Sequence, residues 1–324
     1  MRNSKRGVPV LAVAVLWCWA IGAAAQQFPV RPVRLIVPQS AGGSTDVIAR
    51  VVAQRMSEGL GQPVVVDNRP GAGTLIGVEL VANAAPDGYT LLGVASSYTI
   101  IPALHKKLPF DPVRDMSAVT QLATLPHILV LHPSVPAHSV KELVALARAR
   151  PGQLNFASSG FGTSTHMAAE LFMFMTGTRM VNVTYKGGAP AMVGMLGGQC
   201  QLNFATISTA IPHVRAGKLR ALAVTGDKPS VAAPEYSTMA EAGVPGYHHT
   251  SWIGLFAPAR TPRAVIVRLH AEASAAVRSQ EVKTVLIGDG LEATGTTPGE
   301  FAAFVQAEIA KWMKVTKAAN ITAP

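Results

Sequence analysis

The sequence predicts an α/β protein of two lobes, each a mainly parallel sheet flanked by helices, with two strands crossing between the lobes. Three observations lead to this fold. Short apolar runs alternate with longer segments of helical period along the chain, which is typical of parallel βαβ units. Two apolar runs far apart in the chain end in the same pattern of prolines. Two glycine-rich turns, one in each half, lie between a predicted strand and a predicted helix.

Length and composition agree with this fold class. The chain has 324 residues, of which 49% are hydrophobic and 14% are charged. Low charge with ample apolar content excludes a disordered chain. At this length a single core seldom keeps growing, so the chain is expected to divide into two domains or to form one large α/β domain.

The first 25 residues are predicted to be a secretory signal peptide. A basic start at residues 2–6 is followed by an apolar run, and alanines at residues 23–25 precede Gln26, as in an A-x-A cleavage site. The alternative is a membrane anchor, because the uncharged run over residues 8–25 is near the spanning minimum of about 17 residues. Its end in small residues favours cleavage before Gln26. We therefore expect a soluble periplasmic protein.

Charge and cysteine content exclude several functions. The formal net charge is +10, yet Lys and Arg form no run and aromatic residues make up only 6% of the chain. Nucleic-acid binding is therefore not expected, whereas a diffuse positive field favours small anions. Cys18 leaves with the predicted signal, so Cys200 in its apolar run is expected to be a buried, inert thiol. No zinc, P-loop or dinucleotide motif is present, and we expect no metal and no cofactor.

The predicted elements of the first half are strands at 33–37, 64–67 and 89–94 and helices at 46–58 and 74–83. In the middle of the chain the same periodicity predicts helices at 140–149, 163–175, 189–196 and 207–216 and strands at 154–157, 181–185, 202–205 and 219–224. Alternation of this kind indicates parallel strands joined by helical crossovers.

Two further strands are expected to join the lobes. Residues 128–132 and 252–257 are apolar, and a proline follows each strand and opens the next helix, which gives a stiff, directed exit. A hinge of two such segments is the architecture of periplasmic binding proteins, which close around a ligand. The predicted organisation is a signal peptide at 1–25, a first lobe at 26–127 plus 252–324, and a second lobe at 128–251. The first lobe would include C-terminal helices at 262–279 and 298–318.

The two glycine-rich turns are the strongest functional candidates. They cover residues 38–46 (PQSAGGSTD) and 157–164 (ASSGFGTS), each before a predicted helix. Backbone N–H groups at a helix N-terminus lack intrahelical partners, and glycine lets them turn toward one anion. Further donors are the hydroxyls of Ser40, Ser44, Ser158, Ser159 and Thr163. Either turn alone is explained as well by a tight turn and helix cap. The pair, one per lobe, favours a site for the two carboxylates of a small diacid.

His166 and Glu170 are the main candidates for catalysis. Their spacing of four residues on a predicted helix suits metal binding or acid–base chemistry. An exported serine-type hydrolase that uses His166 on a small ester or amide is the alternative function. No nucleophile elbow or third ligand accompanies them. A pair on the helix surface is therefore the preferred interpretation.

A series of sequence blocks follows in order along the chain: residues 38–46, 66–73, 86–92, 108–112, 157–160, 166, 170–172, 185–187, 219–224, 240–243, 252–255, 257–258 and 261–262. Together these blocks resemble the Bug family of extracytoplasmic solute receptors, the substrate-binding components of tripartite tricarboxylate transporters. The resemblance covers nearly the whole mature chain. Departures at Gln39, Thr184, residues 198–201 and residues 234–238 leave the identity of the ligand open.

The resemblance implies a non-catalytic, monomeric receptor that captures a small carboxylate in a cleft between two α/β lobes, for uptake or sensing. Its partners would be that carboxylate and the membrane subunits of a tripartite transporter. By the same resemblance the ligand site comprises Gln39, Ser40, Ala41, Gly42, Gly43, Thr45, Asp46, Ser96, Ser97, Ser158, Ser159, Gly160, Thr163, His166, Tyr185 and Thr206.

Overall fold

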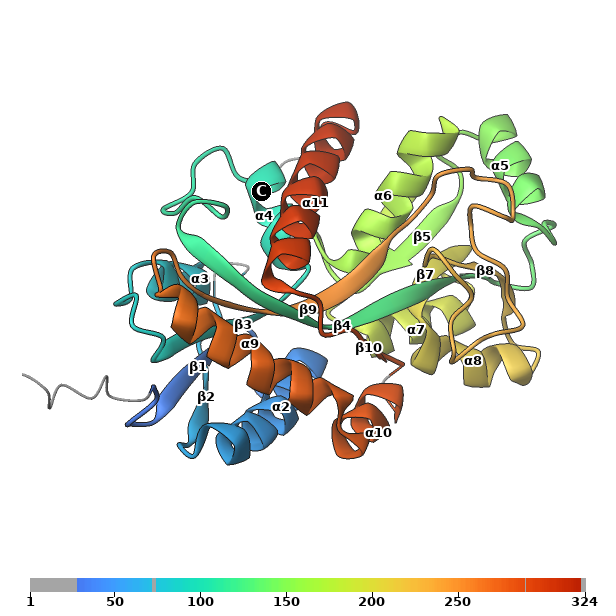
Figure 1. Cartoon of the computed structure of the whole chain (residues 1–324). Coiled ribbons are helices and arrows are strands. Elements are labelled where there is room, and N and C mark those ends of the chain that lie inside the picture. Colours follow the sequence, from blue (N-terminus) through green and yellow to red (C-terminus); the bar gives the residue numbers. More distant parts are fainter. Residues whose placement is uncertain (1–27, 72–73, 289, 322–324) are drawn as a thin grey trace, which may run out of the picture.

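A curled sheet flanked by helices forms the framework of the computed structural model, which describes residues 28–71, 74–288 and 290–321 (Figure 1). The strands are β1 (Val33–Val37), β2 (Val64–Asn68), β3 (Thr90–Ala95), β4 (Met116–Leu131), β5 (Asn155–Ser158), β6 (Val181–Thr184), β7 (Leu202–Thr206), β8 (Arg220–Val224), β9 (Thr250–Pro258) and β10 (Glu292–Ala293). The helices are α2 (Ser44–Leu60), α3 (Leu75–Ala82), α4 (Ser97–Leu104), α5 (Val140–Ala149), α6 (Ser164–Thr176), α7 (Gly188–Leu196), α8 (Ile207–Arg215), α9 (Arg263–Arg278), α10 (Gln280–Gly288) and α11 (Pro298–Ala318).

The sheet order confirms the predicted two-lobed α/β fold. Its strands run β2-β1-β3-β9-β4-β7-β5-β6, and β8 and β10 also pair with β4. In the first lobe β1 is parallel to β2 and β3, and in the second lobe β5 is parallel to β6 and β7. The long strands β4 and β9 are antiparallel to each other and pass between these two parallel groups.

Strand β4 is longer than the sequence predicts. It pairs with β9 from Met116 to Pro126, and from His127 onward its partners are β7 and β8. The prediction located only its second part, because polar residues interrupt the apolar pattern of the first. Two of these, Thr120 and Gln121, are buried and bond residues 294–296, for example from Thr120 Oγ1 to the Thr296 carbonyl oxygen at 2.8 Å.

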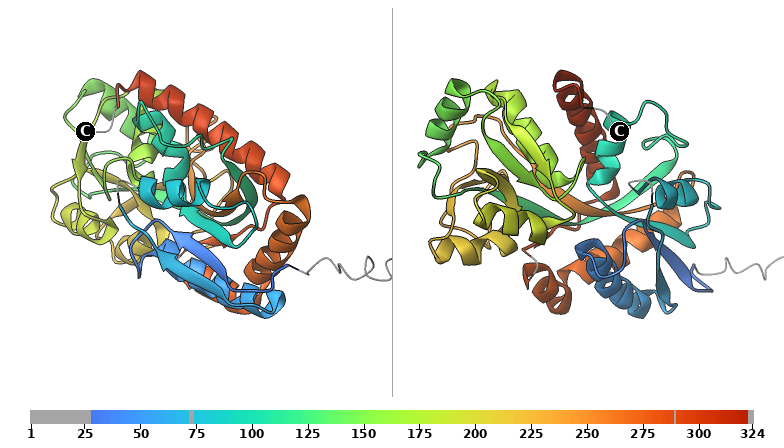
Figure 2. Two further views of the ribbon diagram at one scale, coloured as in Figure 1. Left: turned by 90° about the vertical axis from the view of Figure 1, so that its left-hand side faces the viewer. Right: turned by 180° about the vertical axis from the view of Figure 1, so that it is seen from behind.

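Helices cover both faces of the sheet (Figure 2). On one side α2 and α9 pack together against β1 and β4, and α7 and α8 cover the second lobe. On the other side lie α3, α4, α5, α6 and α11. Helix α5 and helix α11 begin and end at the predicted residues, whereas α4, which contains Pro102, was missed.

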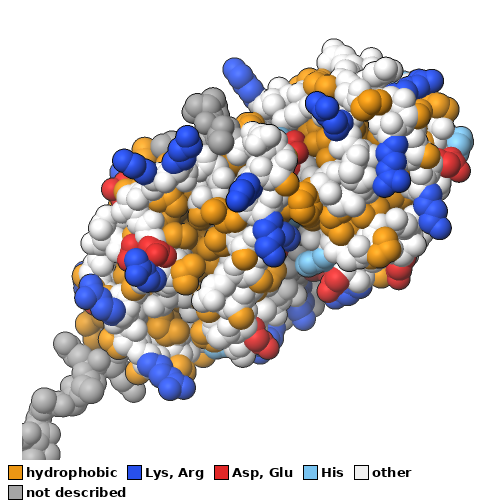
Figure 3. Space-filling view, turned by 90° about the horizontal axis from the view of Figure 1, so that it is seen from above, with side chains coloured by type: hydrophobic (Ala, Val, Ile, Leu, Met, Phe, Trp, Pro, Cys, Tyr) orange, Lys and Arg blue, Asp and Glu red, His pale blue; other side chains and the backbone are white. Residues whose placement is uncertain are grey.

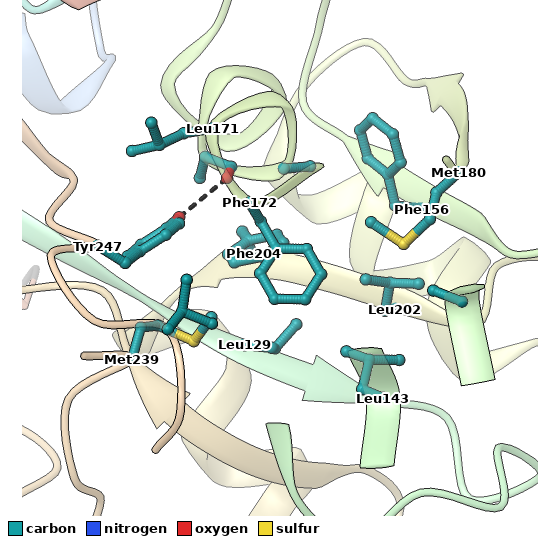
Figure 4. Close-up of a cluster of buried hydrophobic side chains, with 14 of the residues drawn as sticks. Leu129, Leu143, Phe156, Leu171, Phe172, Met180, Leu202, Phe204, Met239 and Tyr247 are labelled. Atoms are coloured by element: carbon teal, nitrogen blue, oxygen red, sulfur yellow. Dashed lines mark hydrogen bonds between the residues drawn. The ribbon is translucent and has the colours of Figure 1, made fainter. Parts of the chain in front are cut away.

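One core lies under β5, β7 and α6 in the second lobe (Figure 4). Phe156, Phe172 and Phe204 fill its centre, and the buried Tyr247 hydroxyl donates to the Ala168 carbonyl oxygen at 2.9 Å. Helix α11 takes part in two cores. Its Phe301 packs in the core of the first lobe, whereas its Trp312 packs in this second-lobe core.

The predicted signal peptide and its alternative as an anchor lie outside the described residues. Among the residues that the structure does describe, no helix combines the length and apolar character needed to cross a bilayer.

Candidate functional site

A cavity of about 750 Å³ lies where parallel strands of both lobes end. Residues 38–40 follow β1, and residues 70, 71 and 74 follow β2. Residues 95–97 lie at the end of β3, and residues 161–164 follow β5. In open α/β sheets, ligands bind outside the carboxyl ends of the strands. The described lining residues are Pro38, Gln39, Ser40, Pro70, Gly71, Thr74, Ala95, Ser96, Ser97, Ile100, Ile101, Leu104, His105, Phe161, Gly162, Thr163, Ser164 and Ser251.

The described wall of the cavity lacks carboxylate, ammonium and guanidinium groups. No Asp, Glu, Lys or Arg is among the described lining residues, and His105 is the one titratable side chain of that set. Ile100, Ile101 and Leu104 on α4 form an apolar wall, to which the 42% exposed Phe161 is added from the second lobe. Serine and threonine hydroxyls make up most of the polar wall, with the Ser96 and Ser251 oxygens 3.0 Å apart.

Two helix N-termini provide donors at this cavity. In the described residues no acceptor is found for the N–H groups of Ser97 and Tyr98 at the start of α4, or of Ser164, Thr165 and His166 at the start of α6. Neither helix has an acidic residue in its first turn. Both helix ends can therefore accept an anion, through free N–H groups and the positive end of the helix dipole.

The structure brings part of the predicted site together. Gln39, Ser40, Ser96, Ser97 and Thr163 line the cavity. The other predicted residues lie outside this lining: Ala41, Gly42, Gly43, Thr45, Asp46, Ser158, Ser159, Gly160, His166, Tyr185 and Thr206.

In the first glycine-rich turn, Asp46 holds the chain in place. Its buried carboxylate accepts the Gly42 N–H at 2.9 Å, Asn68 Nδ2 at 2.9 Å and Arg50 Nε at 3.0 Å. Burial alone would raise the pKa of Asp46, but these hydrogen bonds and the Arg50 charge outweigh it, so the pKa lies below its ordinary value. The Gly42 N–H, expected to face a ligand, is therefore used inside the turn. The exposed Ser44 also lies outside the lining.

In the second turn, His166 takes the position that Asp46 has in the first, four residues after a glycine and in the first turn of the helix. Its Nδ1 accepts the Gly162 N–H at 3.1 Å, so its ring proton lies on Nε2, 3.2 Å from Glu170 Oε1. The expectation of a surface pair was wrong, because His166 is only 2% and Glu170 only 9% exposed. His166 packs between Phe156 and Phe161. Since it bonds Gly162 and Glu170 rather than a serine, this geometry gives the hydrolase alternative no support.

The hydroxyls of the second turn mostly bond one another. Ser159 Oγ lies 2.8 Å from Thr165 Oγ1 and 3.2 Å from Thr163 Oγ1, and the Ser159 N–H donates to Thr165 Oγ1 at 2.9 Å. Thr163 Oγ1 also donates to the Gly160 carbonyl oxygen at 2.6 Å. These side chains shape the turn more than they face the cavity.

Tyr185 and Thr206 have partners of their own elsewhere in the second lobe. The Tyr185 hydroxyl donates to Gln199 Oε1 at 2.9 Å and lies 3.7 Å from the Cys200 sulfur. Thr206 Oγ1 lies 2.6 Å from Thr209 Oγ1 at the start of α8. The predicted burial of Cys200 is confirmed, and this burial raises the pKa of its thiol.

Several lining residues were missed by sequence reasoning. Thr74 is nine-tenths buried, its Oγ1 has no partner among the described residues, and its φ of 87° is unusual for a β-branched residue. Ser164 and Ser251 come from two other parts of the chain. A signal for Thr74 was available, because its segment follows a parallel strand in the same way as the two glycine-rich turns.

Charged groups do not gather into a site on the face seen in Figure 3, where Lys and Arg are scattered. Within the described part of the chain, no three His, Cys, Asp or Glu side chains are placed to hold a metal ion.

Comparison with known proteins gives consistent matches. Residues 48–321 match the family described as tripartite tricarboxylate transporter family receptor. Protein BugT of Bordetella pertussis is 37% identical over 295 residues, covering 90% of each chain. Rpa4515 of R. palustris, solved with adipate, is 36% identical with a TM-score of 0.76, covering 91% of this chain and 99% of that one. MatC of Rhodopseudomonas palustris, with bound malate, is 32% identical with a TM-score of 0.73, covering 89% and 99%.

Proposed function

Because the chain belongs to the tripartite tricarboxylate transporter receptor family, we propose that it is a periplasmic receptor that captures a small organic carboxylate in the cavity between its lobes. The observation that carries this proposal is the meeting of the α4 and α6 N-termini at one cavity whose described lining residues include no Asp, Glu, Lys or Arg. Free N–H groups and hydroxyls there hold anionic oxygens by charge-assisted hydrogen bonds.

Two carboxylate groups suit this cavity better than one. One group would bind at the N-terminus of α4, at Ser96 and Ser97, and the other at the N-terminus of α6, at the N–H and hydroxyl of Ser164. The apolar α4 wall would then contact the hydrocarbon segment between them. The adipate and malate in the two related structures support this class of ligand.

The remaining sequence-based expectations enter the proposal as follows. Gln39 and Ser40 are further contacts, as are Thr74 and Ser251, which the sequence did not predict. The other predicted residues in 41–46 and 158–166 support the two turns, whereas Tyr185 and Thr206 lie outside both turns and outside the cavity lining. The signal peptide is cut before Gln26, and the mature protein is a monomer that passes its ligand to membrane transporter subunits without catalysis. Residues 26–127 plus 252–324 and residues 128–251 move as two lobes about β4 and β9, closing over the ligand.

Thermal unfolding with small acids tests the proposal. Adipate, malate and their diamides are added to the purified mature protein. A bound acid at about 100 times its Kd stabilises the fold by about 2.7 kcal/mol, a rise of several degrees in Tm at roughly 2–4 °C per kcal/mol. The uncharged diamides should give no rise. Equal shifts with acid and diamide would contradict carboxylate recognition, and no shift with any of a panel of organic acids would contradict the receptor function.

A further inference from the structure

Ser164, the first residue of α6, has contacts that its role as a cavity residue does not require. Its Oγ lies 2.7 Å from His127 Nε2 and 2.8 Å from His249 Nε2. His127 is on β4 where that strand leaves β9, and His249 immediately precedes β9. Ser164 lines the cavity, whereas neither histidine is among the lining residues.

Both histidines are enclosed and uncharged. His127 is 1% exposed and His249 is fully buried. Burial lowers the pKa of His127 to about 4, and burial, followed by the charge of Lys311, lowers the pKa of His249 well below its ordinary value. At neutral pH each imidazole therefore carries one ring proton.

Hydrogen-bond partners locate these two protons. His249 Nε2 also lies 3.0 Å from the Ser164 carbonyl oxygen, which only accepts, so the proton of His249 is on Nε2. The Nδ1 atoms of His127 and His249 are both buried, with no partner among the described residues. A proton there would be an unpaired buried N–H, which is rarer in proteins than an unpaired acceptor. The proton of His127 therefore also lies on Nε2 and is donated to Ser164 Oγ, while the His249 N–H is shared between Ser164 Oγ and the Ser164 carbonyl oxygen.

In this arrangement the Ser164 hydroxyl can still donate one hydrogen bond. A hydroxyl oxygen has two acceptor positions and one hydrogen, and the two N–H groups occupy both positions. The hydrogen has no acceptor among the described residues, and the cavity adjoins it. Since both imidazoles donate to the oxygen, neither can take its proton, so Ser164 is not arranged as a nucleophile.

We propose that Ser164 is a specificity-determining residue that donates its hydroxyl to a ligand carboxylate and accepts nothing from the ligand, with His127 and His249 as its positioning residues. The inference rests on the proposed function and deepens it. A ligand must present an acceptor oxygen at this point, and an amino group there would meet a hydroxyl unable to accept its hydrogen.

Binding calorimetry with adipate and malate on the mature protein gives the first test. Ser164→Ala should lose at least tenfold in affinity for the acid that the unchanged protein binds, equivalent to about 1.4 kcal/mol. Ser44→Ala is the matched control, because Ser44 is the first residue of α2 but is exposed outside the lining. It should stay within twofold. Unchanged affinity in Ser164→Ala overturns the inference alone, whereas no binding of any acid by the unchanged protein overturns the proposed function and the inference together.

A second test addresses the histidines without depending on the ligand. Nitrogen NMR of the imidazoles in the free protein should show His127 and His249 neutral and protonated on Nε2. A proton on Nδ1 of His127 overturns the donor-only assignment. The substitutions His127→Leu and Ser164→Ala should also be coupled in their effects on acid affinity. In a His127→Leu background, Ser164→Ala should cost less affinity, because without the His127 N–H the serine hydroxyl accepts hydrogen bonds as well as donating them. Strict additivity of the two substitutions in affinity would make His127 structural only.

Discussion

The two glycine-rich turns share one construction but differ in use. The Gly42 N–H donates to Asp46, and the Gly162 N–H donates to His166. In both turns the acceptor side chain lies four residues after the glycine, in the first turn of a helix. Only the second turn brings its helix N-terminus to the cavity, through Gly162, Thr163 and Ser164. Of the first turn, only Pro38, Gln39 and Ser40, which precede its glycines, are among the described lining residues.

The residue that closes each turn accounts for this difference. Asp46 places a buried carboxylate in the first turn of α2, where it already satisfies the positive end of the helix. Imidazole closes the second turn, and α6 has no acidic residue in its first turn. The α6 end therefore keeps its attraction for an external anion. A Gly/Ser turn before a helix indicates an anion site only when no acidic side chain of the helix occupies it.

Asp46→Ala should have the largest effect on stability. Gly42, Asn68 and Arg50 would lose a charged acceptor, which lowers the free energy of unfolding by about 2–3 kcal/mol. Because the folded pKa of Asp46 lies below its ordinary value of 3.8, this stability is present above pH 3.8 and is lost as pH falls through the folded pKa. Denaturant unfolding at neutral and acid pH measures it. A deficit that stays the same at acid pH would mean that the carboxylate charge is unimportant in this turn.

Gly162→Ala should affect both stability and binding. Gly162 has a φ of +71°, which costs alanine about 1–2 kcal/mol, and its added Cβ would lie 2.8 Å from Leu104 Cδ1 across the cavity. Gly177→Ala is the matched control at the other end of α6, with a φ of +64° and no atom within 4 Å of the added Cβ. Both variants should unfold more easily, but only Gly162→Ala should weaken binding in calorimetry. Unimpaired acid binding by Gly162→Ala would remove the second turn from the site.

The smallest effect is expected from a matched pair of threonines. Thr165 Oγ1 accepts the Ser159 N–H, whereas for Thr45, at the same position in α2, no side-chain hydrogen bond is found among the described residues. Thr165→Val should cost about 1 kcal/mol of unfolding free energy, and Thr45→Val should be close to neutral. Chemical denaturation compares them directly. Equal losses would show that the hydroxyl network of the second turn adds nothing to its stability.

The sequence predicted elements where local pattern was sufficient. Strand β1 and helix α5 begin and end as expected, because their apolar residues repeat with the period of the element. Helix α4 was missed because Pro102 and two serines suggest a turn. The apolar cavity wall at Ile100 and Ile101, which lies on this helix, was therefore not predicted either. Long-range contacts, rather than the local sequence pattern, determine the structure of α4.

The site illustrates the same limit. His166 stood out through its spacing to Glu170, yet the histidines that contact Ser164 are 37 and 85 residues away in the chain. No periodicity links such positions, since strand pairing and the crossing of β4 and β9 bring them together. The local sequence identified the two turns, and only the fold showed which of the two helix N-termini lies at the cavity.

Helix α11 has a consequence for the order of events during synthesis. Phe301 and Trp312 are fully buried in different cores, one in each lobe, and both belong to α11, which follows the other described elements in the chain. A ribosome delivers a chain from its N-terminus, and a domain folds once its segments are available. Both cores therefore stay open on the α11 side until residues 298–318 have been synthesised. We expect the growing chain to remain loosely packed until that point, the state in which an unfolded polypeptide can be threaded across a membrane.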